Sequence, residues 1–507
     1  MALPLLLVAL SSPILSLIDV AAVGRSAGVL QLASLGPATA VCDLSMYVFA
    51  TLSIVTTRLA AAALVKDDAC EAATKVSDGV LVAAAVGAVW GGVLLSPVAP
   101  ALLNIFLPAT VDARVLPMAL AYTRIRALGF VAALATIVLQ SSALVRRNLR
   151  LPLAAVAIGS LLNAAGDWWL VLRCGMGVRG AAWATVAAQV AACGVLARAE
   201  LEYNAKKSAT QQRRGVRDRV RGLTSFLALC VSPSLALIGK LSVVLTVSAT
   251  ASACGTISLA AHQVLNSVFQ LFRPMGDSLG QTIQTLLPAV MANNDNNSYD
   301  SLEGIGDQHD AATTTTRGGA IVLSREAMSV LRVMCAAAVG LGVVDAVVGS
   351  AIPGLAPFLF TPDAVVAGQI ARTAPLIGAV LLVHALSTTL EGVLFATGDA
   401  KAVAKIYTLN SVLVTLVFGA IRARGEPQLR LVWGSFLAYQ VVRVSQFGLR
   451  LIWNQRDRRT IKKKRQIWRW LLKERLSGLQ ADAADLDGVV WSTSYEARKY
   501  SAMDYSV

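Results

Sequence analysis

Residues 2–23 read ALPLLLVALSSPILSLIDVAAV, a predominantly apolar run. A transmembrane helix needs about 20 such residues, so the run is long enough for one crossing of a bilayer. Pro13 lacks a backbone N–H and can bend the helix as a hinge. Asp19 brings a carboxylate into the same helix, and ionisable groups in hydrocarbon are costly enough to indicate a function. The stretch therefore predicts a membrane helix that also belongs to a site.

The rest of the chain repeats this pattern. Hydrophobic residues make up 56% of the 507 residues and charged residues only 15%, unlike a soluble domain. Twelve apolar runs are long enough to cross a bilayer, so we expect an all-α membrane protein with twelve transmembrane helices. The runs are 2–23, 33–63, 79–102, 118–145, 152–173, 180–200, 223–248, 257–290, 328–349, 369–397, 402–422 and 430–453.

An internal repeat divides these runs into two sets of six. SPILSLI at Ser12–Ile18 reappears as SPSLALI at Ser232–Ile238, and Leu139-Gln140 aligns with Leu390-Glu391. Six helices per repeat is an even number, so both halves have the same orientation. We expect two parallel-repeat six-helix bundles, an N-terminal lobe at 1–200 and a C-terminal lobe at 223–453.

Charged and polar stretches connect these lobes and follow them. We expect a basic cytoplasmic linker at 201–222, a disordered loop at 291–327, and a basic amphipathic segment with a disordered tail at 454–507. Residues 456–475 contain ten Lys and Arg, and the whole chain has a net charge of +15. We expect this segment to bind anionic lipid at the inner leaflet rather than nucleic acid. The positive-inside rule then places both termini in the cytoplasm or its organellar equivalent.

Acidic and amide side chains in the first half suggest an ion site. Asn163 and Asp167 are four residues apart, so they share one helical face, where their oxygens could hold a proton or a hard cation. Asp19 could bind and release protons, and Tyr122 and Thr185 could add hydroxyl groups. Two alternatives remain open: Asp19 could lie at a helix end near the interface, and Asn163 could make an ordinary interhelical hydrogen bond.

The second half contains both signs of charge inside its apolar runs. Lys240 could neutralise Asp277 or Glu391, or a cationic lobe could hold an anionic substrate. Arg273 and Asp277 are four residues apart and could simply pair. Asp43 in the first half is isolated in the sequence, and we expect a structural role for it.

No pattern indicates an enzyme. The seven Cys and three His lack metal-ligand spacing, and neither a phosphate-binding loop nor a Ser/His/Asp arrangement occurs. We therefore expect a monomeric membrane protein that uses no cofactor beyond a coupling H⁺ or Na⁺ and binds a small organic substrate.

Ordered motifs along the chain resemble the multidrug and toxic compound extrusion (MATE) family, and most closely its DinF-like branch. The resemblance lies in ILSLIDVAAVGR at Ile14–Arg25, LASLGPAT at Leu32–Thr39, AAHQ at Ala260–Gln263 and EGVLFATGD at Glu391–Asp399. Tyr122, Arg126, Asn163, Asp167 and Thr185 also match in register. Val20 stands where the family usually has Thr, and Glu391 stands where it usually has Asp.

This resemblance implies a V-shaped multidrug or xenobiotic antiporter, which exports an organic cation, organic acid or xenobiotic in exchange for protons or sodium ions. It places Asp19, Tyr122, Asn163, Asp167 and Thr185 at the family's cation-coupling site. Lys240, Asp277 and Glu391 are the weaker matches, for substrate binding or charge balance. The alternative is a lipid or lipid-linked oligosaccharide flippase of the same superfamily.

The branch also bears on location. It includes proteins of plastids and plasma membranes, so we expect a multi-pass protein of the plastid envelope or the plasma membrane. No cleavable signal or transit peptide precedes the first run, so this run is either a signal-anchor helix or preceded by a missing extension.

Overall fold

The computed structural model describes residues 2–65, 69–146, 148, 150–207, 216–299, 325–425 and 428–455. One compact unit includes residues 1–319 and 324–448. A second unit includes residues 320–323 and 449–507, of which 449–455 are described as the end of a helix. All packing and sites below lie within the first unit.

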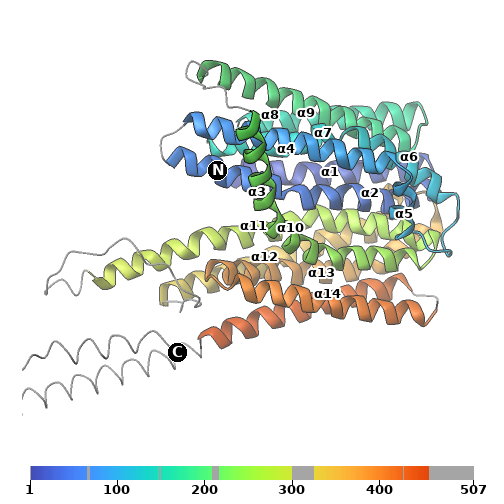
Figure 1. Ribbon diagram of the computed structural model, residues 1–507. Helices are drawn as coiled ribbons and strands as arrows, with labels where there is room; N and C mark the ends of the chain where they lie inside the picture. The colour runs from blue at the N-terminus through green and yellow to red at the C-terminus, as the bar shows by residue number, and fades with distance from the viewer. Residues whose placement is uncertain are drawn as a thin grey trace, which may run out of the picture. The chain divides into compact units, whose positions relative to one another are not determined.

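The described chain is helical from end to end, and many of its helices run along a common direction (Figure 1). The first half contains α1 Ala2–Ser26, α2 Val29–Phe49, α3 Thr51–Val65, α4 Ala69–Leu95, α5 Val98–Asn104, α6 Val115–Leu128, α7 Phe130–Val145, α8 Arg150–Gly166, the π-helical η1 Asp167–Arg173 and α9 Val178–Lys207. The second half contains α10 Val216–Ser252, α11 Thr256–Tyr299, α12 Arg325–Leu355, the 3₁₀ turn η3 Pro357–Leu359, α13 Ala364–Ala396, α14 Ala400–Ala423 and a last helix at 429–455.

Each of the twelve predicted runs falls on a helix or a pair of consecutive helices. Among the described residues, seven helices are long and apolar enough to cross a membrane, or eight if α6 and α7 count as one bent span. The chain is therefore an all-helical, multi-pass membrane protein, as the composition predicted.

One predicted single span is sharply bent in the structure, and two others are irregular within a continuous candidate span. The run 118–145 bends by 52° at Gly129, between α6 and α7. The run 152–173 changes from α-helix to π-helix at Asp167, and the run 33–63 is interrupted at Ala50. Hydropathy cannot reveal such breaks, because the apolar composition continues across them.

The polar connections are shorter than predicted. The loop expected at 291–327 is helical at both ends, since α11 continues to Tyr299 and α12 begins at Arg325. The linker expected at 201–222 is likewise helical to Lys207 and again from Val216. A formed helix gains one hydrogen bond for each residue added, so it can extend beyond the hydrocarbon core. The remaining loop and linker residues, and residues 456–507 with the lipid-binding segment, lie outside the described residues.

Matching turns join the helices of the two halves. Gly28 between α1 and α2 has φ 83°, and Gly255 between α10 and α11 has φ 92°. The offset of 227 between them is the one that aligns Leu32 with Leu259. Gly175 and Gly425, with φ 65° and 79°, form a second such pair before the last helix of each half. Residues with a Cβ rarely adopt these angles, so the repeat extends to its turns.

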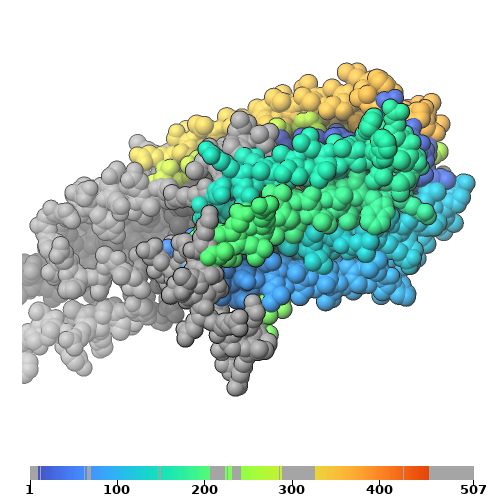
Figure 2. All heavy atoms as spheres, turned by 90° about the horizontal axis from the view of Figure 1, so that it is seen from above, coloured from blue at the N-terminus to red at the C-terminus, as the bar shows by residue number. Residues whose placement is uncertain are grey.

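Core packing and lipid exposure follow the apolar composition. In the second half, α13 packs against both α11 and α12, and in the first half α8 packs against α9 and α4 against α7. Helices α1 and α2 both contact α11, which joins the halves. On the outside, large apolar side chains such as Leu161 and Val89 are about 70% exposed, as lipid contact requires. Figure 2 shows α8 and α9, turquoise to green, on one such outer face.

Candidate functional site

A buried polar cluster joins α1, α8 and η1. The Asn163 Nδ2 donates to Asp19 Oδ1 and to Asp167 Oδ2, each at 2.9 Å. The three residues are 8% exposed or less. The structure thus brings Asp19 together with Asn163, which lies 144 positions later in the sequence, and with Asp167. The two carboxyls, with the Asn163 amide between them, are called the acid pair below.

Local helix geometry positions the acid pair. Asn163 and Asp167 are one helical turn apart, so both face α1. Asp167 is also the first residue of the π-helical turn η1. Just after this turn, the Cys174 N–H donates to the Trp169 carbonyl, five positions back, and the Met176 N–H donates to the Leu170 carbonyl, six positions back. Such turns are rare and occur often at functional sites.

The acid pair has fewer donors than acceptors. One amide group serves both carboxyls, and Asp167 Oδ1 is buried without a hydrogen-bond partner among the described residues. The Asp19 and Asp167 carboxyls also lie within hydrogen-bonding reach of each other. Ionised carboxylates only accept hydrogen bonds, so a contact between two of them needs a proton or a cation in between. The arrangement is suited to binding a small positive charge.

The other two residues predicted for this site have different partners. The Tyr122 hydroxyl accepts from Arg126 Nη1 at 3.0 Å, and the Thr185 hydroxyl donates to the Ala181 carbonyl at 2.9 Å. Neither recorded bond reaches the acid pair. Pro13 lies inside α1, half-buried and lining the cavity described below.

The sequence suggested that Asp43 is isolated, but in the structure it has a partner. Its Oδ1 accepts from Arg126 Nη2 at 3.0 Å, and Arg126 is only 6% exposed. The two residues are 83 positions apart, which is why the sequence did not reveal the pair. The sequence did offer one signal for Arg126, its place inside the apolar run 118–145. A cation inside a membrane span is costly unless it has a partner.

The acids of the second half have cationic or hydroxyl neighbours. Asp277 lies 4.0 Å from Arg273 Nε and 3.7 Å from His384 Nε2, so the expected i, i+4 contact is present at the limit of an ion pair. Glu391 accepts a hydrogen bond from the Tyr407 hydroxyl at 2.6 Å. Lys240 lies on α10, and its side chain is outside the described residues.

Sequence reasoning missed Arg443, a buried cation close to Glu391. Its guanidinium lies within electrostatic range of Glu391, hydrogen-bonds Ser387, and lies 5.9 Å from the Tyr407 ring centre. From the sequence, Arg443 was not singled out within the run 430–453. Its burial at 3% exposure distinguishes it from the arginines at helix ends.

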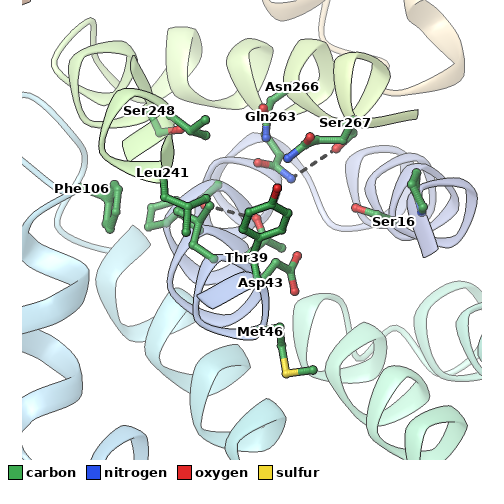
Figure 3. Close-up of a pocket in the computed structure, with 18 of the residues that line it drawn as sticks. Ser16, Thr39, Asp43, Met46, Phe106, Leu241, Ser248, Gln263, Asn266 and Ser267 are labelled. Atoms are coloured by element: carbon green, nitrogen blue, oxygen red, sulfur yellow. Dashed lines mark hydrogen bonds between the residues drawn. The ribbon is translucent and has the colours of Figure 1, made fainter. Parts of the chain in front are cut away.

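A cavity of about 390 Å³ lies between the two halves. From the first half it is lined by Pro13, Ser16, Thr39, Asp43, Tyr47 and Arg126, and from the second by Leu241, Ser248, His262, Gln263, Asn266 and Arg273, among others. Figure 3 shows Gln263 and Ser267 on α11 across the cavity from Thr39 and Asp43 on α2. Its size falls within the usual range for small-molecule sites.

The halves also touch at the end of the bundle that the loop charges predict to be the outer end. The Asp112 backbone N–H donates to the Thr256 hydroxyl at 2.8 Å. Gly24 packs so closely on the second half that a Cβ there would lie 2.0 Å from the Phe360 carbonyl oxygen. The contacts join the start of α6 to α11 and the end of α1 to the connection before α13.

Comparison with known proteins agrees with this architecture. Residues 4–169 match the family model described as MatE. This matched segment includes Asp19, Asn163 and Asp167. Over 417 residues the chain is 29% identical to Protein DETOXIFICATION 47, chloroplastic, from Arabidopsis thaliana, covering 80% of this chain and 69% of that protein. The chain is thus similar in sequence to proteins of the MATE family, over residues 4–169 to the family model and over 417 residues to this relative.

Solved MATE structures share the whole fold. A multidrug resistance MATE transporter in an inward-facing conformation aligns with a TM-score of 0.69, 14% identity, and coverage of 90% of this chain and 99% of that one. The eukaryotic MATE transporter AtDTX14 aligns with a TM-score of 0.61 and 16% identity over 91% and 97% of the chains. The shared fold agrees with the predicted fold class.

Proposed function

We propose that this chain is a MATE-family transporter and works as an antiporter, which exports an organic solute in exchange for protons or sodium ions. The observation that carries the proposal is the acid pair, in which two buried carboxyls share one amide and leave one oxygen without a partner. A gradient can drive transport only if the ion binds the two conformations with different affinity. Buried carboxyls provide that difference if the conformational change alters their solvation.

The acid pair and the cavity share structural elements through which they can be coupled. Ser16 of α1 lines the cavity one turn before Asp19. Arg126 lines it too and lies within electrostatic range of Asp19. Binding a positive charge at the acid pair would remove the attraction between Asp19 and Arg126. Movement of α1 at Pro13 would then alter the cavity wall.

The cycle follows from these parts. With the cavity open outward, cations bind at Asp19 and Asp167, and substrate is released. The halves then close at the outer end through contacts such as Asp112–Thr256, and the cation leaves inward. Tyr122 and Thr185 belong to the proposed cation site by family register, and Lys240, Asp277 and Glu391 to substrate binding or charge balance. We assign the chain to the DinF-like branch and, from the chloroplastic relative, to the plastid envelope.

Reconstitution tests this function. Purified protein in liposomes should release phenyltrimethylammonium or benzenesulfonate faster when a proton or sodium gradient is imposed. Asp19→Asn should abolish this acceleration, while Asp345→Asn, a matched control at a buried aspartate on α12, should retain it. Gradient-driven release at the wild-type rate by Asp19→Asn would disprove the assignment of the acid pair.

A further inference from the structure

The cavity between the halves is lined by more positive than negative groups. Its lining includes two arginines, Arg126 and Arg273, and one acid, Asp43. With His262 counted as neutral, two positive charges and one negative charge leave a formal charge of +1. A buried charge needs a partner, so this excess indicates what the cavity accepts.

The two arginines come from different halves and approach the same face of α2. Asp43 and Tyr47 are one turn apart on α2. Arg126 donates to Asp43 at 3.0 Å, and the Arg273 guanidinium lies 5.3 Å from the Tyr47 ring centre. The two guanidinium groups therefore contact residues that are one helical turn apart on α2, and both line the cavity.

Both arginines retain hydrogen-bonding capacity. The Nε atoms of Arg126 and Arg273 are buried and have no hydrogen-bond partner among the described residues. The same holds for both ring nitrogens of His262, which is 2% exposed. An unpaired buried donor costs roughly 1–3 kcal/mol, so a ligand that supplies acceptor oxygens would relieve this cost.

The acidic neighbours of the arginines set the charge of the ligand. Asp43 already contacts Arg126, and its side chain remains 52% exposed. It would therefore repel the second anionic group of a dianionic ligand. Asp277 lies 4.0 Å from Arg273 and 3.7 Å from His384, and it is not part of the cavity lining. An organic cation would have to approach two guanidinium groups, and of the two acids that offset them Asp43 is the one on the cavity wall and Asp277 lies outside the lining.

We propose that the cavity binds small organic monoanions, with a carboxylate or sulfonate group held between Arg126 and Arg273. The apolar body of the ligand would contact Met46, Phe106 and Leu241, which line the same space. Arginine suits this role because its planar fork matches an anionic group with two or more oxygens. The proposal rests on the proposed function, since it names the class of solute that the antiporter carries.

Binding to purified protein in nanodiscs, without any gradient, tests the substrate class separately from transport. Calorimetry would compare benzenesulfonate, the neutral benzenesulfonamide, the cation phenyltrimethylammonium and the dianion 1,3-benzenedisulfonate. We expect benzenesulfonate to bind most tightly. Arg273→Gln should weaken its binding about tenfold, the equivalent of one charge-assisted hydrogen bond.

Further variants separate charge recognition from misfolding. Arg273→Lys should bind benzenesulfonate more tightly than Arg273→Gln, because it keeps the charge. Arg198→Gln, a matched control at an exposed arginine on α9, should bind like the wild type. Asp43→Asn should improve binding of the dianion. Size-exclusion profiles and unfolding temperatures would confirm that each variant folds.

The outcomes distinguish the two proposals. Tighter binding of phenyltrimethylammonium than of benzenesulfonate, or unchanged benzenesulfonate binding in a folded Arg273→Gln protein, would overturn the anion site. It would leave gradient-driven export intact. Selective binding of benzenesulfonate without any gradient-driven release would instead support the anion site and contradict the antiporter.

Discussion

The two halves share their turns but differ at the positions of the acid pair. With the repeat offset of 220, Asp19 corresponds to Gly239, and with the offset of 251 that aligns Gln140 with Glu391 ahead of the next helix, Asn163 and Asp167 correspond to Val414 and Phe418. Val414 and Phe418 are buried apolar residues of α14. The equivalent helices of the two halves thus provide a buried polar cluster in one half and apolar packing in the other.

The second half has its own buried carboxyl, but in a different setting. Glu391 receives a hydrogen bond from Tyr407 and has Arg443 within electrostatic range. In the acid pair, by contrast, two carboxyls share the neutral amide of Asn163. A carboxyl with a hydrogen-bond donor and a nearby cation has less need of a transported ion. The comparison therefore locates ion coupling in the first half.

Copying the second half into the first should have the largest effect. The double variant Asn163→Val/Asp167→Phe replaces two members of the acid pair with their counterparts and leaves Asp19 alone. We expect gradient-driven release from liposomes to fall to the level of protein-free liposomes. Release close to the wild-type rate, from protein with a normal size-exclusion profile, would contradict the comparison.

Replacing Arg443 should destabilise the second half. Arg443→Met removes the buried cation within electrostatic range of Glu391 together with its hydrogen bond to Ser387, and the loss of a hydrogen bond to a charged group costs about 1.5–3 kcal/mol. We expect a marked drop in unfolding temperature in detergent, and Glu391→Gln in the same protein should recover part of it. An equal drop in the single and double variants would show that Arg443 does not serve Glu391.

The matched turns should respond alike. Gly28→Ala and Gly255→Ala each place a Cβ at a positive φ, which costs about 1–2 kcal/mol. Gly194→Ala, in the middle of α9 with open space around it, should instead stabilise slightly. Unfolding temperatures of the three variants would measure this, and clearly unequal losses at Gly28 and Gly255 would argue against equivalent turns.

The aspartates before α6 and α13 should show the smallest difference between the halves. Asp112 and Asp363 are equivalent at the offset of 251 that also aligns Gln140 with Glu391. Asp363 caps α13 by accepting from Val365 N and Val366 N, so Asp363→Ala should cost about 1 kcal/mol. Asp112 instead forms an exposed pair with Arg114, so Asp112→Ala should lower the unfolding temperature less.

Acid should affect the Asp112 contact in a defined direction. The Arg114 side chain and backbone N–H lower the pKa of Asp112 to about 2, below its usual value of about 3.9. Its contribution to stability is therefore complete above about pH 4 and is lost as the pH falls toward 2. Asp112→Asn should remove that part of the pH dependence of the unfolding temperature, and an unchanged profile would show that the contact is not formed.

Sequence reasoning predicted features that depend on local spacing. Hydropathy located the helices, and the i, i+4 spacing of Asn163 and Asp167 predicted their shared face. It could not predict contacts between distant segments, such as Arg126 with Asp43 or Arg443 with Glu391, because spacing within one helix says nothing about which helix lies opposite. The breaks at Gly129 and Asp167 were missed for a different reason, since apolar composition continues across them.

A side-by-side transport assay of Asp19→Asn and Glu391→Gln tests the central claim most directly. Both variants replace one buried carboxyl with its amide, one in each half, in the same liposomes and under the same proton or sodium gradient. The account predicts that gradient-driven release is lost in Asp19→Asn and retained in Glu391→Gln. Loss only in Glu391→Gln would place ion coupling in the second half and contradict the account.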